Sequence, residues 1–159
     1  YLDEKYPDNP LNPQNKELDE LMEYCDKTIN FMAFRLSVMD AFNYMDEASK
    51  KYFRESKEPI FHAKLEDLAG NREENIATYY ETLKPVIERL EKSKFINGDK
   101  PLIHDYLIIA KIQMVRTGSP QTYDELVNNN PSEVFKNWVE RMNSLFDGFL
   151  NNRKTILSE

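Results

Sequence analysis

One stretch, LIHDYLIIAKIQMV at positions 102–115, most constrains the fold, because ten of its fourteen residues are apolar. A segment of this length that is apolar nearly all round is typical of a helix buried at the centre of a bundle. A pair of buried strands would also be apolar, but the length and the helical spacing of apolar residues on both sides favour a helix. We therefore expect an all-α fold around this central helix. Its core is expected to include Ile103 and residues 107–112.

Three further segments carry apolar residues at spacings of three and four, which predicts three amphipathic helices. The stripes are Leu18, Leu21, Met22, Cys25, Ile29 and Met32; Ile76, Tyr79, Tyr80, Leu83, Val86, Ile87 and Leu90; and Val134, Trp138, Met142, Leu145, Phe146 and Phe149. Pro85 lies inside the second stripe and is expected to kink its helix. No segment alternates convincingly between apolar and polar residues, as a half-buried strand would.

Prolines and capping residues set the expected limits of the other elements. The run from Pro7 to Pro13 cannot be helical, because each proline disfavours helix in the residue before it, so we expect an extended linker there. Residues 33–45 are apolar but irregular, and we expect a helix end followed by a short loop. Asp46 then predicts the N-cap of a helix that ends at about Ser56, before Pro59.

The composition excludes several classes of function. The 159 residues include 28 acidic and 21 basic side chains, a net charge of −7, which is not the basic field that a nucleic-acid binder needs. Two histidines and one cysteine leave no His-based metal set and no internal disulfide. No apolar run approaches the roughly 20 residues of a membrane span. The four glycines lie too far apart for a phosphate-binding loop. We therefore expect no nucleic acid, no metal and no membrane partner.

The chain contains the stretches YLDEKYPDNPL at residues 1–11 and FINGDKPLIHDY at residues 95–106. Both resemble parts of cytosolic glutathione transferases at and within the C-terminal helical domain. Residues 1–11, YLDEKYPDNPL, are similar to the end of the third helix of that family's thioredoxin-like domain and the interdomain linker. Residues 95–106, FINGDKPLIHDY, are similar to the family's FLxGDxPSxADxxL entry into its central helix. Within the family, residues 52–66 and 112–120 resemble the YFRxSRExxFGxxLEE and LQWARxxSP stretches of β-etherase-like glutathione transferases.

The resemblance implies a division of the chain and a function. Residues 1–13 would be the end of the thioredoxin-like domain and the linker, 14–150 the helical domain, and 151–159 a polar tail. The chain starts at Tyr1 without Met, and we expect it to begin inside a longer protein. That protein would be a cytoplasmic homodimer with a role in detoxification, which conjugates or thiolytically cleaves a small hydrophobic electrophile with glutathione. The missing domain would hold the thiol-activating residue and most of the glutathione contacts, so no catalytic residue is predicted here.

The rival interpretation is a non-catalytic interaction module. Helical domains resembling this one also occur in translation-factor and synthetase complexes, where they only bind partners. An activating Ser, Tyr or Cys in the upstream sequence would favour the enzyme. The sequence of this chain favours an enzyme but leaves both interpretations open.

Four residues are singled out as candidate site residues. Phe34 and Tyr44 follow the first long helix, a region that in glutathione transferases borders the pocket for the hydrophobic co-substrate. Arg116 follows the central helix, where it could hold a polar or anionic end of that substrate. The competing interpretation places both aromatic rings in the core and pairs Arg116 with a carboxylate. Asp105 is predicted to be structural: in the family a Ser or Thr and this Asp form a capping box, and here Leu102 holds the Ser/Thr position.

Overall fold

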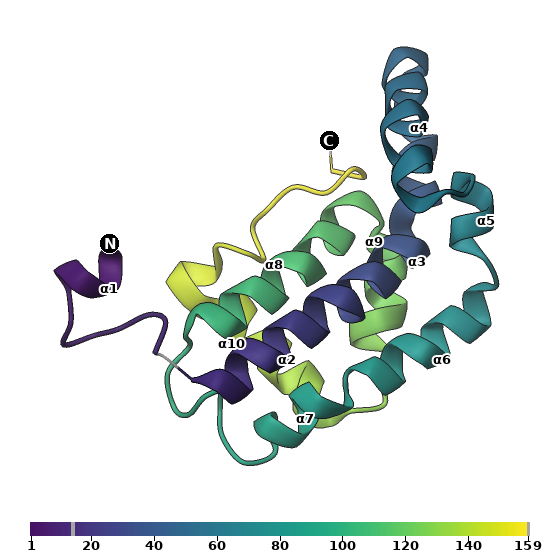
Figure 1. The fold of residues 1–159 in the computed structure, drawn as a ribbon. Coiled ribbons are helices and arrows are strands. Elements are labelled where there is room, and N and C mark those ends of the chain that lie inside the picture. Colours follow the sequence, from purple (N-terminus) through teal and green to yellow (C-terminus); the bar gives the residue numbers. More distant parts are fainter. Residues whose placement is uncertain (14, 159) are drawn as a thin grey trace.

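Helices form all the regular secondary structure of residues 1–13 and 15–158, the part of the chain that the computed structural model describes (Figure 1). The helices are α1 Leu2–Lys5, α2 Lys16–Lys27, α3 Ile29–Asn43, α4 Glu47–Phe61, α5 Leu65–Ala69, α6 Arg72–Thr82, α7 Lys84–Leu90, α8 Ile103–Gly118, α9 Pro120–Tyr123, the π-helical turn η1 Asp124–Asn128, and α10 Glu133–Gly148. Helix α8 packs against α2, α3, α9 and α10. The all-α expectation is confirmed, and the apolar stretch at 102–115 is the central helix.

Helix α3 shows where the sequence prediction was wrong. Residues 33–43 are helical, and the turn comes only at Tyr44. Helix α3 packs against α6 and α8 of the bundle and also against α5. A helix that is covered on several sides carries apolar residues on several faces, so it has no single stripe that a sequence pattern could reveal.

Pro59 and Pro85 both lie inside observed helices, and only Pro85 was predicted to do so. The helix predicted from the apolar stripe between Ile76 and Leu90 divides at Leu83 into α6 and α7. Pro85 lies in the first turn of α7, where its missing N–H leaves no bond unmade. Asp46 caps α4 as expected, but α4 continues through Pro59 to Phe61, so the predicted end at Ser56 is wrong. Pro59 lies in the last turn of α4, where it removes only one backbone hydrogen bond.

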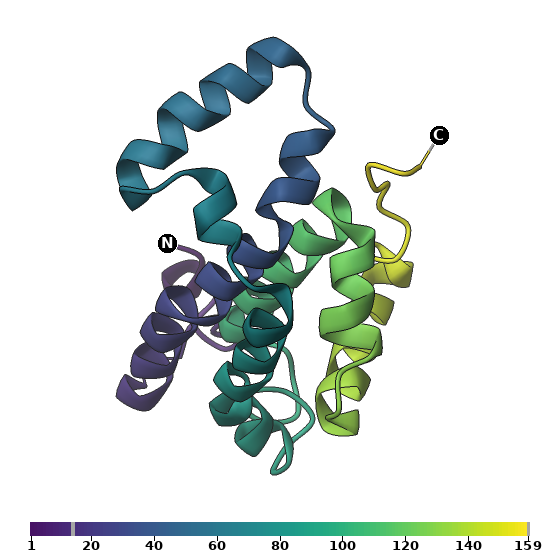
Figure 2. The ribbon, with the colours of Figure 1, turned by 90° about the vertical axis from the view of Figure 1, so that its right-hand side faces the viewer.

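Helix α4 stands clear of the bundle as an arm (Figure 2). None of its side chains is fully buried, and α5 returns the chain to the bundle. A small apolar cluster fills the base of the arm, separate from the main core of the bundle. Its buried members are Val38, Phe42 and Leu65, and its partly buried members are Phe34, Met39, Met45, Phe53, Leu68 and Ala69.

Helix α8 is buried on most of its circumference but not on all of it. Ile108, Ile109 and Ile112 are buried, whereas Leu107 is 47% exposed and Ala110 is also exposed. The prediction that Ile103 and all of residues 107–112 lie in the core is therefore wrong for these two, and Ile103 and Lys111 are only partly buried. The described residues place helices against the other sides of α8 and leave this apolar face open.

Candidate functional site

The entry to the central helix is organised by the carboxylate of Asp105. This side chain is fully buried and accepts hydrogen bonds from the backbone N–H of Ile96 at 3.0 Å and of Leu102 at 3.1 Å. It also accepts one from the indole Nε1 of Trp138 on α10 at 2.8 Å. The Leu102 side chain has no acceptor, so the carboxylate makes the remaining half of the capping box. These bonds join α8, α10 and the turn before α8, while the structural role of Asp105 stays a prediction.

An apolar groove of about 720 Å³ runs between α8 and the chain that ends α10. We call it the α8–α10 groove. The residues that line it are Tyr106, Ile109, Ala110, Gln113, Met114, Thr117, Gly118, Met142, Leu145, Phe146, Phe149, Leu150 and Arg153. Most of these side chains are aliphatic, aromatic or thioether groups. Such a lining, with few polar groups, is typical of small-molecule sites.

One wall of the groove is made by an unusual end of α10. The backbone is extended at Leu145 (ψ 152°) and left-handed at Phe146 (φ 52°), Asp147 (φ 55°) and Gly148 (φ 74°). Left-handed backbone costs a non-glycine residue roughly 1–2 kcal/mol, so Phe146 and Asp147 are locally strained. The bend leaves Phe146 74% exposed beside the groove.

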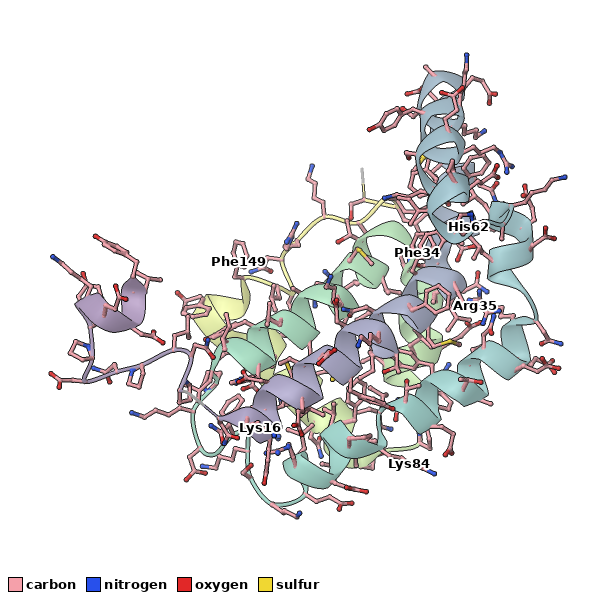
Figure 3. All side chains as sticks on the ribbon, in the orientation of Figure 1. Lys16, Phe34, Arg35, His62, Lys84 and Phe149 are labelled. Atoms are coloured by element: carbon pink, nitrogen blue, oxygen red, sulfur yellow. The ribbon has the colours of Figure 1, made fainter. Side chains whose placement is uncertain are left out.

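Phe149 completes that wall on the outer side of the bundle (Figure 3). It is 60% exposed, so the prediction that Phe146 and Phe149 belong to the buried stripe of the last helix is wrong. The stripe prediction assumed a helix that stays regular through Phe149. Gly148 was the signal for an earlier end, because glycine in left-handed backbone commonly terminates helices.

A short chain of hydrogen-bonded polar side chains begins at Gln113, which lines the groove. Gln113 on α8 is 2% exposed, and its Nε2 donates to Oδ1 of Asn143 on α10 at 2.7 Å. Nδ2 of Asn143 donates in turn to the phenolic oxygen of Tyr123 at 3.2 Å. Oε1 of Gln113 has no hydrogen-bond partner among the residues that the structure describes. Burial raises the pKa of Tyr123, so its phenol stays protonated at neutral pH.

The three residues predicted to line the substrate wall lie in different surroundings. Phe34 stacks on Phe61 at the base of the arm, with the ring centroids 5.2 Å apart. Tyr44 follows α3 and is 61% exposed. Figure 3 shows Phe34 well separated from Phe149. None of the three predicted residues is among those that line the α8–α10 groove, and their role in binding stays a prediction.

Arg116 holds the C-terminal segment in place by hydrogen bonds to its backbone. Its guanidinium donates to the carbonyl oxygens of Leu150 at 3.1 Å, Asn151 at 3.0 Å and Arg153 at 3.2 Å. The backbone N–H of Ile156 also donates to the carbonyl oxygen of Thr117 at 2.9 Å. The segment after α10, which includes the predicted polar tail, is therefore held against the end of α8.

The described residues offer few other groups that could react with a substrate or bind a metal ion. Burial raises the pKa of Cys25 to about 12, so its thiol stays protonated and is a core group rather than a nucleophile. Within residues 1–13 and 15–158, no three His, Cys, Asp or Glu side chains are grouped so as to hold a metal ion. Over the same residues, no helix is both long enough and apolar enough to cross a membrane.

Comparison with known proteins shows which family this helical fold belongs to. The family profile described as "Glutathione S-transferase, C-terminal domain" matches residues 21–144. The chain belongs to the glutathione S-transferase family. The matched residues run from α2 into α10, so the α8 wall of the groove lies inside this C-terminal domain. The strained turn that carries Phe146 and Phe149 lies just beyond the matched residues.

A curated relative supports the same assignment to the glutathione S-transferases. The chain is similar to "Glutathione S-transferase-like protein ustS" of Aspergillus flavus, with 24% identity over 152 residues. The similarity covers 87% of this chain and 55% of that protein. The chain thus spans about half the length of the curated relative that it matches.

Proposed function

We propose that the chain is the substrate-pocket domain of a glutathione transferase that conjugates or thiolytically cleaves a small hydrophobic electrophile. The observation that carries this proposal is the α8–α10 groove, about 720 Å³ of apolar-lined space in a domain of this family. Binding an electrophile against a fixed apolar wall brings it to the attacking thiolate and lowers the entropic part of the barrier. The β-etherase-like subclass, a cytoplasmic homodimer and a role in detoxification are parts of the same proposal.

Activation of glutathione belongs to another part of the protein. The only cysteine is buried and protonated, and the described residues form no nucleophile and base pair around the groove. We propose that residues 1–13 lead from a thioredoxin-like domain, which binds glutathione and lowers the pKa of its thiol. Leu107, which is exposed on the open face of α8 and does not line the groove, offers that domain an apolar contact beside it.

Two sets of residues compete for the substrate wall. The groove set is continuous and joins α8 to the end of α10. The predicted set is spread over α3 (Phe34), the turn after α3 (Tyr44) and the end of α8 (Arg116), and Arg116 already uses its donors on backbone oxygens. We favour the groove, because its apolar side chains enclose one common volume.

Steady-state kinetics on the full-length protein test this proposal. With glutathione and a chlorodinitrobenzene as substrates, Ala110→Trp should fill the groove and raise KM for the electrophile about tenfold or more, with KM for glutathione unchanged. Ala48→Trp, on the exposed arm, is the matched control and should leave both KM values unchanged. A full-length protein that shows no conjugation above the uncatalysed rate would instead be the non-catalytic interaction module.

A further inference from the structure

One buried polar atom in the lining of the α8–α10 groove makes no hydrogen bond within the described chain. Gln113 lines the groove, and its Oε1 is buried without a hydrogen-bond partner. A buried carbonyl oxygen without a donor has lost its hydrogen bond to water and gained none in return, which is unfavourable. A ligand that supplies the missing donor recovers part of that cost, so this atom marks where a ligand would gain specificity.

The donor-to-acceptor direction of the hydrogen bonds from Gln113 to Tyr123 indicates which kind of ligand group can pair with Gln113. The Nε2 of Gln113 is used as a donor to Asn143, and the Nδ2 of Asn143 is used as a donor to the phenolic oxygen of Tyr123. Donors therefore point away from the groove along the chain, and the free end at Gln113 is an acceptor. The free acceptor calls for a ligand with an O–H or N–H group.

We propose that the α8–α10 groove selects hydrophobic ligands that carry one hydrogen-bond donor, such as aromatic alcohols and phenols, and that Gln113 is the residue that recognises the donor. This proposal rests on the proposed function only in taking the groove as the co-substrate site. The apolar walls bind the ring system, and they do not discriminate between a ring with a hydroxyl and one without it. The carbonyl oxygen of Gln113 supplies that discrimination, because a ligand without a donor leaves it unpaired.

The groove can open to this oxygen. Oε1 is covered when the groove is empty, and two of the side chains that line the groove with it, Met114 and Met142, are unbranched thioethers. Methionine changes rotamer readily and fills irregular gaps, so it yields to an entering ring more easily than a branched side chain does. The 720 Å³ of the groove falls in the range of sites that hold ring-sized ligands.

Three probes that share one ring system separate the hydrogen bond from the apolar contact. Naphthalene has no polar group, methoxynaphthalene has only an acceptor, and naphthol has a donor. Binding to the 159-residue chain, followed by the fluorescence of the probe, should be about 3- to 10-fold tighter for naphthol than for the other two. Equal binding of all three, or tighter binding of methoxynaphthalene, overturns the proposal.

Variants then assign the preference to Gln113. Gln113→Met removes the carbonyl at nearly constant volume and should abolish the preference for naphthol while naphthalene still binds. Gln121→Met makes the same change at an exposed position outside the groove and should keep the preference. A preference that survives in Gln113→Met, with an unchanged melting temperature, overturns the role of Gln113.

The two proposals fail in different ways. If the groove is not a ligand site, naphthalene and naphthol both fail to bind, and both proposals are overturned at this site. If both probes bind, and Ala110→Trp removes both, the groove is a ligand site. Equal affinities in that case overturn only the donor recognition by Gln113.

Discussion

Replacing Asp105 should test how the central helix is fixed at its entry. Asp105→Ala removes the acceptor of three N–H groups, from Ile96, Leu102 and Trp138. Two of those bonds are buried, whereas the one from Leu102 is only partly buried, so water can replace the carboxylate there. Two orphaned buried donors at roughly 1–3 kcal/mol each, less the desolvation of the carboxylate, predict a loss of about 2–4 kcal/mol in the free energy of unfolding.

That loss is a large fraction of the roughly 5–15 kcal/mol by which domains of this size are stable. Urea denaturation measures it, and the single tryptophan, fully buried at position 138, reports unfolding by its fluorescence. Asp99→Ala, at an exposed position in the preceding turn, is the control and should change the free energy of unfolding by less than about 0.5 kcal/mol. Asp105→Asn keeps one acceptor but sets its amide N–H against a donor, so about half of the loss is expected.

A double-mutant cycle isolates the bond to the indole. Asp105→Ala and Trp138→Phe, alone and together, should give a coupling energy of about 1–3 kcal/mol by circular dichroism. A loss below about 1 kcal/mol for Asp105→Ala would refute the reasoning, because it would mean that the three donors find other partners at little cost.

The remaining predictions concern the core, the pH dependence, the substrate wall and the location of the chemistry. Ile109 is 2% exposed, and Ile109→Ala should lower the free energy of unfolding by about 2–5 kcal/mol. Leu107→Ala, on the open face of α8, should lower it by less than about 1 kcal/mol. Equal losses for the two variants in urea denaturation would contradict the assigned orientation of α8. Burial lowers the pKa of His104, so its neutral form is favoured in the folded chain, and its stabilising effect is complete above the unfolded-state pKa of about 6.5 and is lost as the pH falls below it. His104→Phe should therefore flatten the fall of the melting temperature between about pH 7 and pH 5, and identical slopes in both proteins would rule this out. If Phe34 and Arg116 line the substrate wall, Phe34→Ala and Arg116→Ala should weaken binding of the electrophile to the full-length protein. The melting temperature and the affinity for glutathione should stay nearly unchanged. A melting temperature lower by several degrees, with unchanged affinity for the electrophile, would make both residues structural. The 159-residue chain alone should not conjugate glutathione to a standard electrophile, and measurable turnover above the uncatalysed rate would show that the chemistry lies within it.

The sequence by itself determined the fold class and the family. A fourteen-residue stretch that is apolar nearly all round had to be covered on most sides, and amphipathic helices on both sides of it supplied the cover. Capping residues such as Asp46 acted locally, through hydrogen bonds to the next turn, so their positions were readable from the chain. The motif around Asp105 was readable for the same reason, since half of its capping box lies within four residues.

The helix limits at α3 and α4 needed the tertiary structure. Helix α3 carries apolar residues on several faces because α5, α6 and α8 pack against it from different sides. Helix α4 passes Pro59 because Phe61, beyond the proline, packs on Phe31 and Phe34 of α3. Contacts between segments distant in the chain outweighed local propensity in both cases.

The candidate site also came from the tertiary structure alone. Sequence spacing placed Leu107 in the core and Phe149 in a buried stripe, but the first faces outward and the second follows a strained turn at the end of α10. Periodicity tells which residues share a face of a helix, and it does not tell whether the chain supplies a partner for that face. The α8–α10 groove exists because the last turn of α10 bends away and leaves one face of the central helix uncovered, and Gln113 lies in its lining.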